Sequence, residues 1–154
     1  MRLRLIAVGT RMPAWVRAAS DDYLRRLRGA LAVTLTEIEP GSRRRGSAQA
    51  VAAEGTRLLG SVRPSDHLVA LDEHGTQLST RELAAWLQER MNAGTDLAFA
   101  IGGPDGLPRE VLTRSDLTLS LSRLTLPHAL ARVVLAEQLY RAHCILANHP
   151  YHRD

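Results

Sequence analysis

The sequence predicts an α/β fold with a mainly parallel sheet and helices on both faces. Two observations predict it. Short apolar segments of strand length alternate with longer segments of helical periodicity. Two of the apolar segments end in loops of small or polar residues, and the last such loop leads into a long helical pattern. The 154 residues contain no stretch that resembles a linker, so we expect one domain spanning residues 1–154.

The first two strands and the helix between them are predicted from residues 2–38. Residues 3–7 alternate between apolar and other side chains, which predicts a strand with one edge-like face. Pro13 opens a helix, because the first helical turn tolerates proline. Trp15 lies at helical spacing among apolar neighbours, and we expect it in the core. Residues 31–38 alternate again and predict the second strand.

Residues 39–47 surround three consecutive arginines with turn-forming residues. One interpretation is a solvated loop, as most charged runs are. The other is an arm that contacts RNA phosphates and becomes ordered on RNA, because this is the densest positive charge in the chain. The second interpretation makes Arg43, Arg44 and Arg45 RNA-binding residues.

The second half of the chain continues the alternation of strands and helices. A Ser79–Glu82 capping box marks one helix start. The expected strands are 67–71, ending in a turn at 72–75, then 97–101 and 117–121, and the expected helices are 48–59, 79–91, 108–114 and 127–147.

The charged residues exclude some kinds of site. There are 20 basic and 16 acidic residues, and every basic residue is arginine. Without lysine, the chain cannot form a Schiff base or supply the lysine of a phosphate-binding loop. The glycine patterns of dinucleotide and triphosphate sites are also missing from the sequence. The net charge of +4 permits an RNA partner without requiring one.

The apolar and cysteine content favours a cytoplasmic protein with no membrane partner. The N-terminal apolar stretch is too short for a signal peptide, and no run approaches the length of a membrane span. One cysteine allows no internal disulfide, which fits a reducing compartment. We expect no metal site, because the spacing of the nearby histidines matches no zinc pattern; these residues are His143, Cys144, His149 and His152.

Three predicted strand ends supply candidates for a small-molecule pocket. In open parallel sheets such pockets form at the carboxyl ends of the strands. Gly102 and Gly103 lack a Cβ and would let the backbone approach a ligand, although Gly-Gly-Pro alone is also a tight turn. The loop at 121–126 would contribute backbone polar groups and apolar walls, which suits a nucleoside. The cofactor-binding candidates are Leu71, Gly102, Gly103, Leu121, Ser122, Arg123, Leu124, Thr125 and Leu126.

Six stretches that span the chain carry a family resemblance: residues 1–10, 101–106, 122–128, 132–133, 137–142 and 148–153. They resemble the bacterial ribosomal RNA large-subunit methyltransferase H family, which belongs to the SPOUT class of knotted methyltransferases. The most specific stretches are Leu-Thr-Leu-Pro-His at 124–128 and Asn-His-Pro-Tyr-His-Arg at 148–153.

The resemblance implies a C-terminal trefoil knot, S-adenosyl-L-methionine as cofactor, and a homodimer. It also implies N3-methylation of a pseudouridine in helix 69 of 23S rRNA on assembled ribosomes, with no role for DNA. Two alternatives stay open: a SPOUT methyltransferase that acts on another RNA, and a non-catalytic ribosome-binding factor. The apolar face of the last helix is either core or dimer interface; its residues are Leu135, Leu139 and Ile145.

Methylation at an imide nitrogen requires loss of its proton, so a base or a cation is needed nearby. His128 follows the pocket loop at a helix start, where the helix dipole favours the neutral ring. Arg132 lies one turn further on the same face. His152 and Arg153 belong to the tail, which in the family lies near the active site. These four are the catalytic candidates, while Tyr151 is either a base-stacking RNA contact or a packing anchor.

Overall fold

The computed structural model describes residues 1–152, and of His152 the backbone alone. Five strands form one sheet in the order β2-β1-β4-β3-β5, and every neighbouring pair is parallel. The strands are β1 (Arg2–Val8), β2 (Ala32–Ile38), β3 (His67–Gln77), β4 (Leu97–Ile101) and β5 (Leu117–Ser120). The helices are α1 (Ala14–Arg28), α2 (Ser47–Gly60), α3 (Thr80–Asn92), α4 (Arg109–Arg114) and α5 (His128–Leu146), with short 3₁₀ turns η1 (Arg43–Arg45) and η2 (Pro150–His152).

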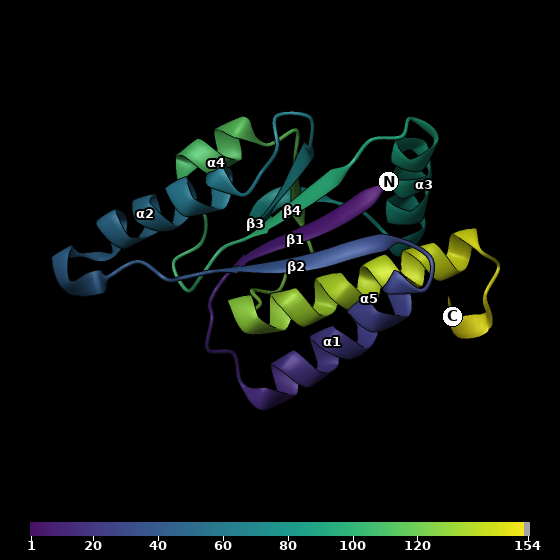
Figure 1. Ribbon diagram of the computed structural model, residues 1–154, viewed down its shortest axis with the longest axis horizontal. Coiled ribbons are helices and arrows are strands. Elements are labelled where there is room, and N and C mark those ends of the chain that lie inside the picture. The colour runs from purple at the N-terminus through teal and green to yellow at the C-terminus, as the bar shows by residue number, and fades with distance from the viewer. Residues whose placement is uncertain (153–154) are drawn as a thin grey trace.

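The helices cover both faces of the sheet, which confirms the predicted fold class (Figure 1). Helices α1, α3 and α5 pack on one face around Leu5 and Phe99. Helices α2 and α4 pack on the other face around Ile6 and Ala98. Burial on both faces explains why β4 is apolar and buried along its whole length.

Strand β1 is interior, so the edge-like face predicted for it is wrong. It pairs with β2 on one side and β4 on the other. The charge of Arg4, which suggested exposure, is instead neutralised by an ion pair with Asp66, whose side chain is fully buried. An arginine in an alternating pattern therefore indicated a buried ion pair and not a solvent-facing side.

Strand β3 runs past the turn that the sequence predicted at 72–75. Its register with β5 shifts between Leu71 and Thr76, so the chain bulges and then pairs again. Gly75 allows this return, because a Cβ at that position would lie 2.6 Å from the carbonyl oxygen of Thr118. The bulge holds Asp72 and Glu73 beside the carboxyl ends of the neighbouring strands.

Trp15 differs from the sequence prediction, and the burial of α5 decides between core and dimer interface for part of that helix. Trp15 is 58% exposed at the start of α1, so its assignment to the core is wrong. Leu135 and Leu139 are completely buried between α5 and the sheet, so this part of α5 is core. Cys144 is also buried in α5. None of the described helices is long and apolar enough to cross a membrane.

Candidate functional site

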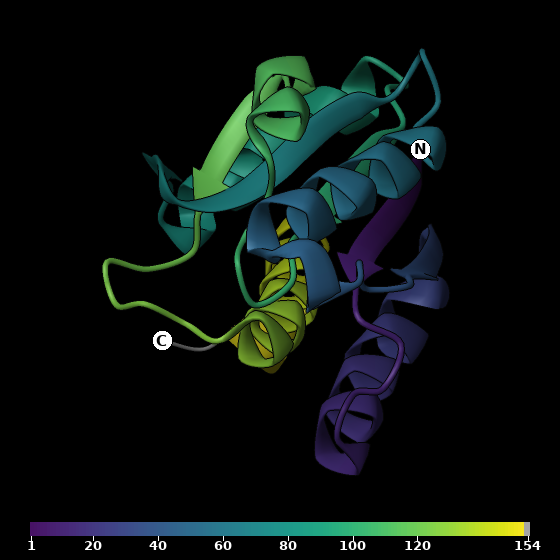
Figure 2. The same ribbon diagram turned by 90° about the vertical axis from the view of Figure 1, so that its left-hand side faces the viewer.

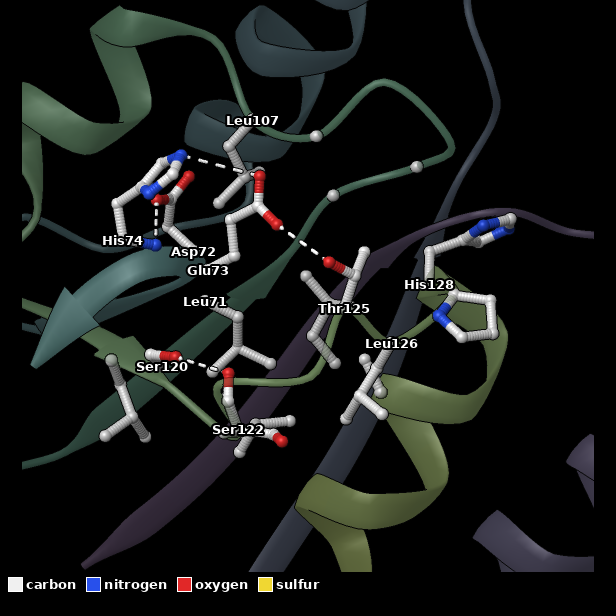
Figure 3. A pocket seen from close by; sticks show the side chains of 18 of the residues that line it. Leu71, Asp72, Glu73, His74, Leu107, Ser120, Ser122, Thr125, Leu126 and His128 are labelled. Carbon is white, nitrogen blue, oxygen red and sulfur yellow. Dashed lines mark hydrogen bonds and ion pairs between the residues drawn. The ribbon is translucent and has the colours of Figure 1, made fainter. Parts of the chain in front are cut away.

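A pocket of about 840 Å³ opens at the bulge of β3, at the carboxyl ends of β4 and β5 and at the start of α5 (Figure 3). Figure 2 shows the loop from β5 to α5 extending from the left-hand side of the molecule. Three loops and the first turn of α5 form its walls, as expected at this edge of a parallel sheet. A volume of this size is typical of sites for small organic ligands. It is lined by residues 71–74, 101–107, 119–122, 124–128 and Ala131.

The structure brings most of the predicted cofactor-binding residues together around this pocket. Eight of the nine line it, as does the catalytic candidate His128. Arg123 is the exception among the nine, because it is exposed on the loop and does not line the pocket. The eight are Leu71, Gly102, Gly103, Leu121, Ser122, Leu124, Thr125 and Leu126.

The two glycines after β4 are required by the loop itself, which differs from the reason the sequence suggested. A Cβ on Gly102 would lie 2.6 Å from the carbonyl carbon of Gly106, and one on Gly103 would lie 3.1 Å from the Val8 side chain. The Gly106 N–H donates to the Gly103 carbonyl at 3.1 Å, and Gly106 has a φ of 77°. These glycines close a tight turn that forms one pocket wall.

The loop after β5 is shaped by two serines. The Ser120 hydroxyl donates to the Ser122 carbonyl at 3.0 Å, and the Ser122 hydroxyl accepts from the Leu124 N–H at 2.9 Å. The Leu124 N–H is therefore occupied, although the sequence suggested that the backbone polar groups of this loop would face a ligand. The side chain of Leu124 is 76% exposed at the pocket rim, where it is available to cover a flat ring.

Two carboxylates from the β3 bulge give the pocket a negative rim (Figure 3). The Thr125 hydroxyl donates to Glu73 Oε2 at 3.3 Å, which joins the β3 bulge to the loop after β5. Asp72 accepts from the His74 N–H at 2.9 Å. Sequence reasoning missed Glu73 because it placed this residue in a turn beyond the end of the strand.

His128 begins α5 and lines the pocket. Burial lowers the pKa of His128, and the positive charge of Arg132 lowers it further. The neutral ring therefore predominates at neutral pH and is able to accept a proton. The sequence predicted this direction from the helix dipole, whereas desolvation is the larger cause in the structure.

Arg132 lies outside the pocket, and its guanidinium is held by other groups. It is 2% exposed. Its Nη1 lies 2.6 Å from Glu37 Oε2, and its Nη2 donates to the Gly9 carbonyl at 3.1 Å. The arginine thus fastens the start of α5 to the ends of β1 and β2. This geometry supports a role in positioning His128 and not one in contacting a substrate.

Glu54 is a buried carboxylate that the sequence analysis missed. It is 1% exposed on α2 and accepts from the Gly41 N–H at 3.0 Å and from Arg43 Nη1 at 2.9 Å. The other guanidinium nitrogen of Arg43 lies 3.1 Å from Asp105 in the pocket loop. An acidic residue within the apolar pattern of 48–59 was the available signal for a buried ion pair.

Comparisons with known proteins agree with this architecture. A family model described as a predicted SPOUT methyltransferase matches residues 1–152. The chain belongs to the SPOUT methyltransferase family. The chain is 54% identical to the ribosomal RNA large subunit methyltransferase H of Thiobacillus denitrificans, and 46% identical to the protein of that name from Chromobacterium violaceum, with 100% of both chains covered in each case.

Solved structures show the same fold at low sequence identity. A probable methyltransferase from Bordetella pertussis has a TM-score of 0.59 at 18% identity, over 92% of this chain and 93% of that one. A probable methylase family protein from Haemophilus influenzae has a TM-score of 0.54 at 16% identity, over 99% of this chain and 70% of that one. The five-stranded parallel sheet is thus the SPOUT fold, and the resemblance seen in the sequence is confirmed.

In this SPOUT methyltransferase Tyr151, in the described part of the tail, packs against α1 and α5 and does not line the pocket. The Tyr151 hydroxyl donates to Glu137 Oε1 at 3.0 Å, and its ring centroid lies 4.7 Å from that of Tyr140. These contacts favour the packing anchor over the base-stacking contact. No described residue after Ala131 lines the pocket. The side chain of His152 and all of Arg153 lie outside the described residues.

Proposed function

We propose that this methyltransferase transfers a methyl group from S-adenosyl-L-methionine to N3 of a pseudouridine in helix 69 of 23S rRNA, on assembled cytoplasmic ribosomes. Full-length identity of 46–54% to relatives named for large-subunit rRNA methylation supports the substrate class. The observation that carries the proposal is the pocket at the carboxyl edge of the sheet, formed by three loops and the start of α5. The trefoil knot is part of the same proposal.

The residues around the pocket fit this donor. The leucines of the loop after β5 provide apolar walls for an adenine ring, and the pocket volume suits a molecule of nucleoside size. The donor carries a sulfonium and an ammonium group, and Asp72 and Glu73 supply negative charge at the rim. When bound, the donor supplies a methyl group that needs no further activation.

The chain itself must orient the acceptor nitrogen and take up its proton. His128 is the described side chain placed to do so, because it lines the pocket and its lowered pKa keeps the ring neutral. Removal of the imide proton leaves a negative charge on the ring of the pseudouridine. We propose that Arg153 offsets this charge and that His152 assists in the proton transfer.

A homodimer would allow the tail to take part. Tyr151 is fixed beside Glu137, nine residues after His128, which corresponds to about 14 Å along the helix axis. Because none of residues 148–151 lines the pocket of its own chain, we propose that a tail that acts there comes from a second copy. The exposed Trp15 and Leu124 are available for contact with that copy.

Two measurements test the proposal. Calorimetry of the purified protein with S-adenosyl-L-methionine should show saturable binding. Mass spectrometry of 23S rRNA should then show an added methyl group on the helix 69 pseudouridine after incubation of protein, donor and unmethylated ribosomes. Donor binding with methylation of another RNA would favour the first alternative. RNA binding without any donor binding would favour a non-catalytic ribosome-binding factor.

A further inference from the structure

A second hollow, of about 300 Å³, lies between η1 and α2. It is lined by Ser42, Arg44, Arg45, Gln49, Ala53 and Arg57. The last three are spaced four residues apart, so they lie on one face of α2. The hollow is therefore a concave surface with three guanidinium groups and one amide, and it contains no acidic side chain.

The charges of these arginines are not neutralised within the described chain. No ion pair there involves Arg44, Arg45 or Arg57, and both Arg44 and Arg45 are exposed. Arg57 donates to the backbone carbonyls of Glu39 and Pro40, which holds the preceding loop in place without removing its charge. Arginine forks in this state are suited to phosphate oxygens.

The start of α2 adds to the positive potential of the hollow. Gly46 caps the helix with a φ of 101° and offers no side-chain hydrogen bond to the first turn, which contains no acidic residue. The free N–H groups of this turn point out of the N-terminal end of α2, and η1 directly precedes that end. Such N–H groups favour an anion, and the arginines beside them supply the net charge.

Arg43 has a different role from its two neighbours. Its guanidinium bridges Glu54 and Asp105, and Asp105 lines the large pocket. One side chain thus connects the turn that carries Arg44 and Arg45 to the glycine loop of that pocket. The hollow and the pocket are consequently held in a fixed relation at the same end of the sheet, where both β2 and β4 terminate (Figure 1).

We propose that Arg44, Arg45, Gln49 and Arg57 form a binding site for phosphate groups of the substrate RNA, and that Arg43 is the residue that positions this site. The inference rests on the proposed function and deepens it. Contacts of these guanidinium groups to phosphate oxygens would hold the RNA backbone, and such contacts carry no sequence information of their own. The sequence suggested Arg43 as an RNA contact, but in this proposal Arg43 positions the site and does not contact the RNA.

The test compares two double variants of equal charge. Arg44→Gln/Arg45→Gln removes two charges from the hollow and spares Arg57. Arg25→Gln/Arg63→Gln is the matched control, because it removes two exposed arginines outside both the hollow and the pocket. Affinity for protein-free 23S rRNA and for intact ribosomes is measured between 50 and 200 mM salt, and donor affinity is measured by calorimetry.

We expect Arg44→Gln/Arg45→Gln to bind both RNA probes more weakly. Log K falls as log salt rises, and this decline should be less steep in the variant, with a slope smaller in magnitude by about 2. The control variant should keep the wild-type slope, and all three proteins should bind the donor equally. Equal RNA affinity and slope for the two double variants would overturn the inference. A loss seen with ribosomes alone would also overturn it, since the surface would then contact a ribosomal protein.

The outcomes separate this inference from the proposed function. If wild-type protein methylates the rRNA while Arg44→Gln/Arg45→Gln binds RNA as the control does, the phosphate site is wrong and the function stands. If the arginines carry RNA binding while wild-type protein neither binds the donor nor methylates, the phosphate site stands and the methyl transfer is wrong.

Discussion

The guanidinium of Arg132 on α5 lies 2.6 Å from the carboxylate of Glu37 at the end of β2. The arginine side chain is 3% exposed and that of Glu37 is 34% exposed, so the guanidinium is shielded from water while the carboxylate is partly solvated. It connects the helix that begins in the pocket with the strand that leads to the arginine-rich turn. The position of His128 therefore depends on a contact between residues 95 positions apart in the sequence.

Arg132→Met should destabilise the fold, because it leaves Glu37 and the Gly9 carbonyl without their donor. The expected loss in the free energy of unfolding is about 2 kcal/mol, measured by urea denaturation, because the buried Gly9 carbonyl loses its donor while the partly exposed Glu37 is solvated by water. Arg25→Met is the control, since it removes only an exposed ion pair on α1 and should change stability little. Unchanged stability together with lost methylation would show that Arg132 acts in the chemistry after all.

The rate of methylation should depend on the ionisation of His128. Its pKa lies below the ordinary value of 6.5, and only the neutral ring accepts a proton. The rate is therefore expected to fall as pH drops through that lowered pKa and to be flat above it. His128→Gln should remove this limb of the pH profile and lower the rate. An identical profile in the variant would assign the proton transfer to another group.

Stability should also decline in mild acid. Burial lowers the pKa of His67, His128 and His143 below 6.5, so the unfolded chain binds more protons than the folded one. The free energy of unfolding consequently decreases as pH falls below about 6.5 and levels off below the folded-state pKa values. Denaturation of His67→Gln/His143→Gln should show a shallower decline. A steeper decline would contradict the assigned direction.

The acidic rim of the pocket should distinguish donor from product. Asp72→Asn/Glu73→Gln is expected to weaken the binding of S-adenosyl-L-methionine more than that of S-adenosylhomocysteine, because the donor has one additional positive charge. Calorimetry with both ligands measures the difference, and Glu89→Gln on the exposed face of α3 is the control. Equal weakening of both ligands would mean that the carboxylates do not sense the sulfonium charge.

Mixing two inactive variants should restore activity if the tail acts on a second copy. Thr125→Trp fills the pocket, and His152→Ala/Arg153→Ala removes the tail candidates. In a mixture of equal parts, about a quarter of the sites of a two-fold dimer combine an intact pocket with an intact tail. Methylation assays of the mixture against each variant alone measure this recovery. A mixture as inactive as its parts would place the tail outside the reaction or within its own chain.

The sheet and the pocket were predictable because they depend on local patterns. Alternating and helical periodicities fixed the element types, and the strand-end rule located the loops around Gly102 and Leu124. The bulge in β3 was not predictable in this way, since it depends on the fit of Gly75 against the backbone of β5. Trp15 was misplaced because periodicity identifies an apolar position without showing whether another element covers it.

The roles of individual arginines were the least accessible to sequence reasoning. Arg43 and Arg44 are adjacent and chemically identical, yet one bridges two carboxylates while the other lies exposed beside a hollow. Arg4, Arg43 and Arg132 each pair with an acid far away in the sequence, namely Asp66, Asp105 and Glu37. Which carboxylate an arginine meets is decided by the assembled fold, and no spacing rule contains that information.

The thiol of Cys144 can be used to measure how often α5 detaches from the rest of the protein. It is the only cysteine, and it is 2% exposed on the helix that begins at the pocket. A thiol reagent can reach it only when α5 separates from its neighbours or the chain unfolds. The rate of alkylation therefore follows how often this helix detaches, and a ligand that holds the helix down would slow that rate without any label having to be introduced.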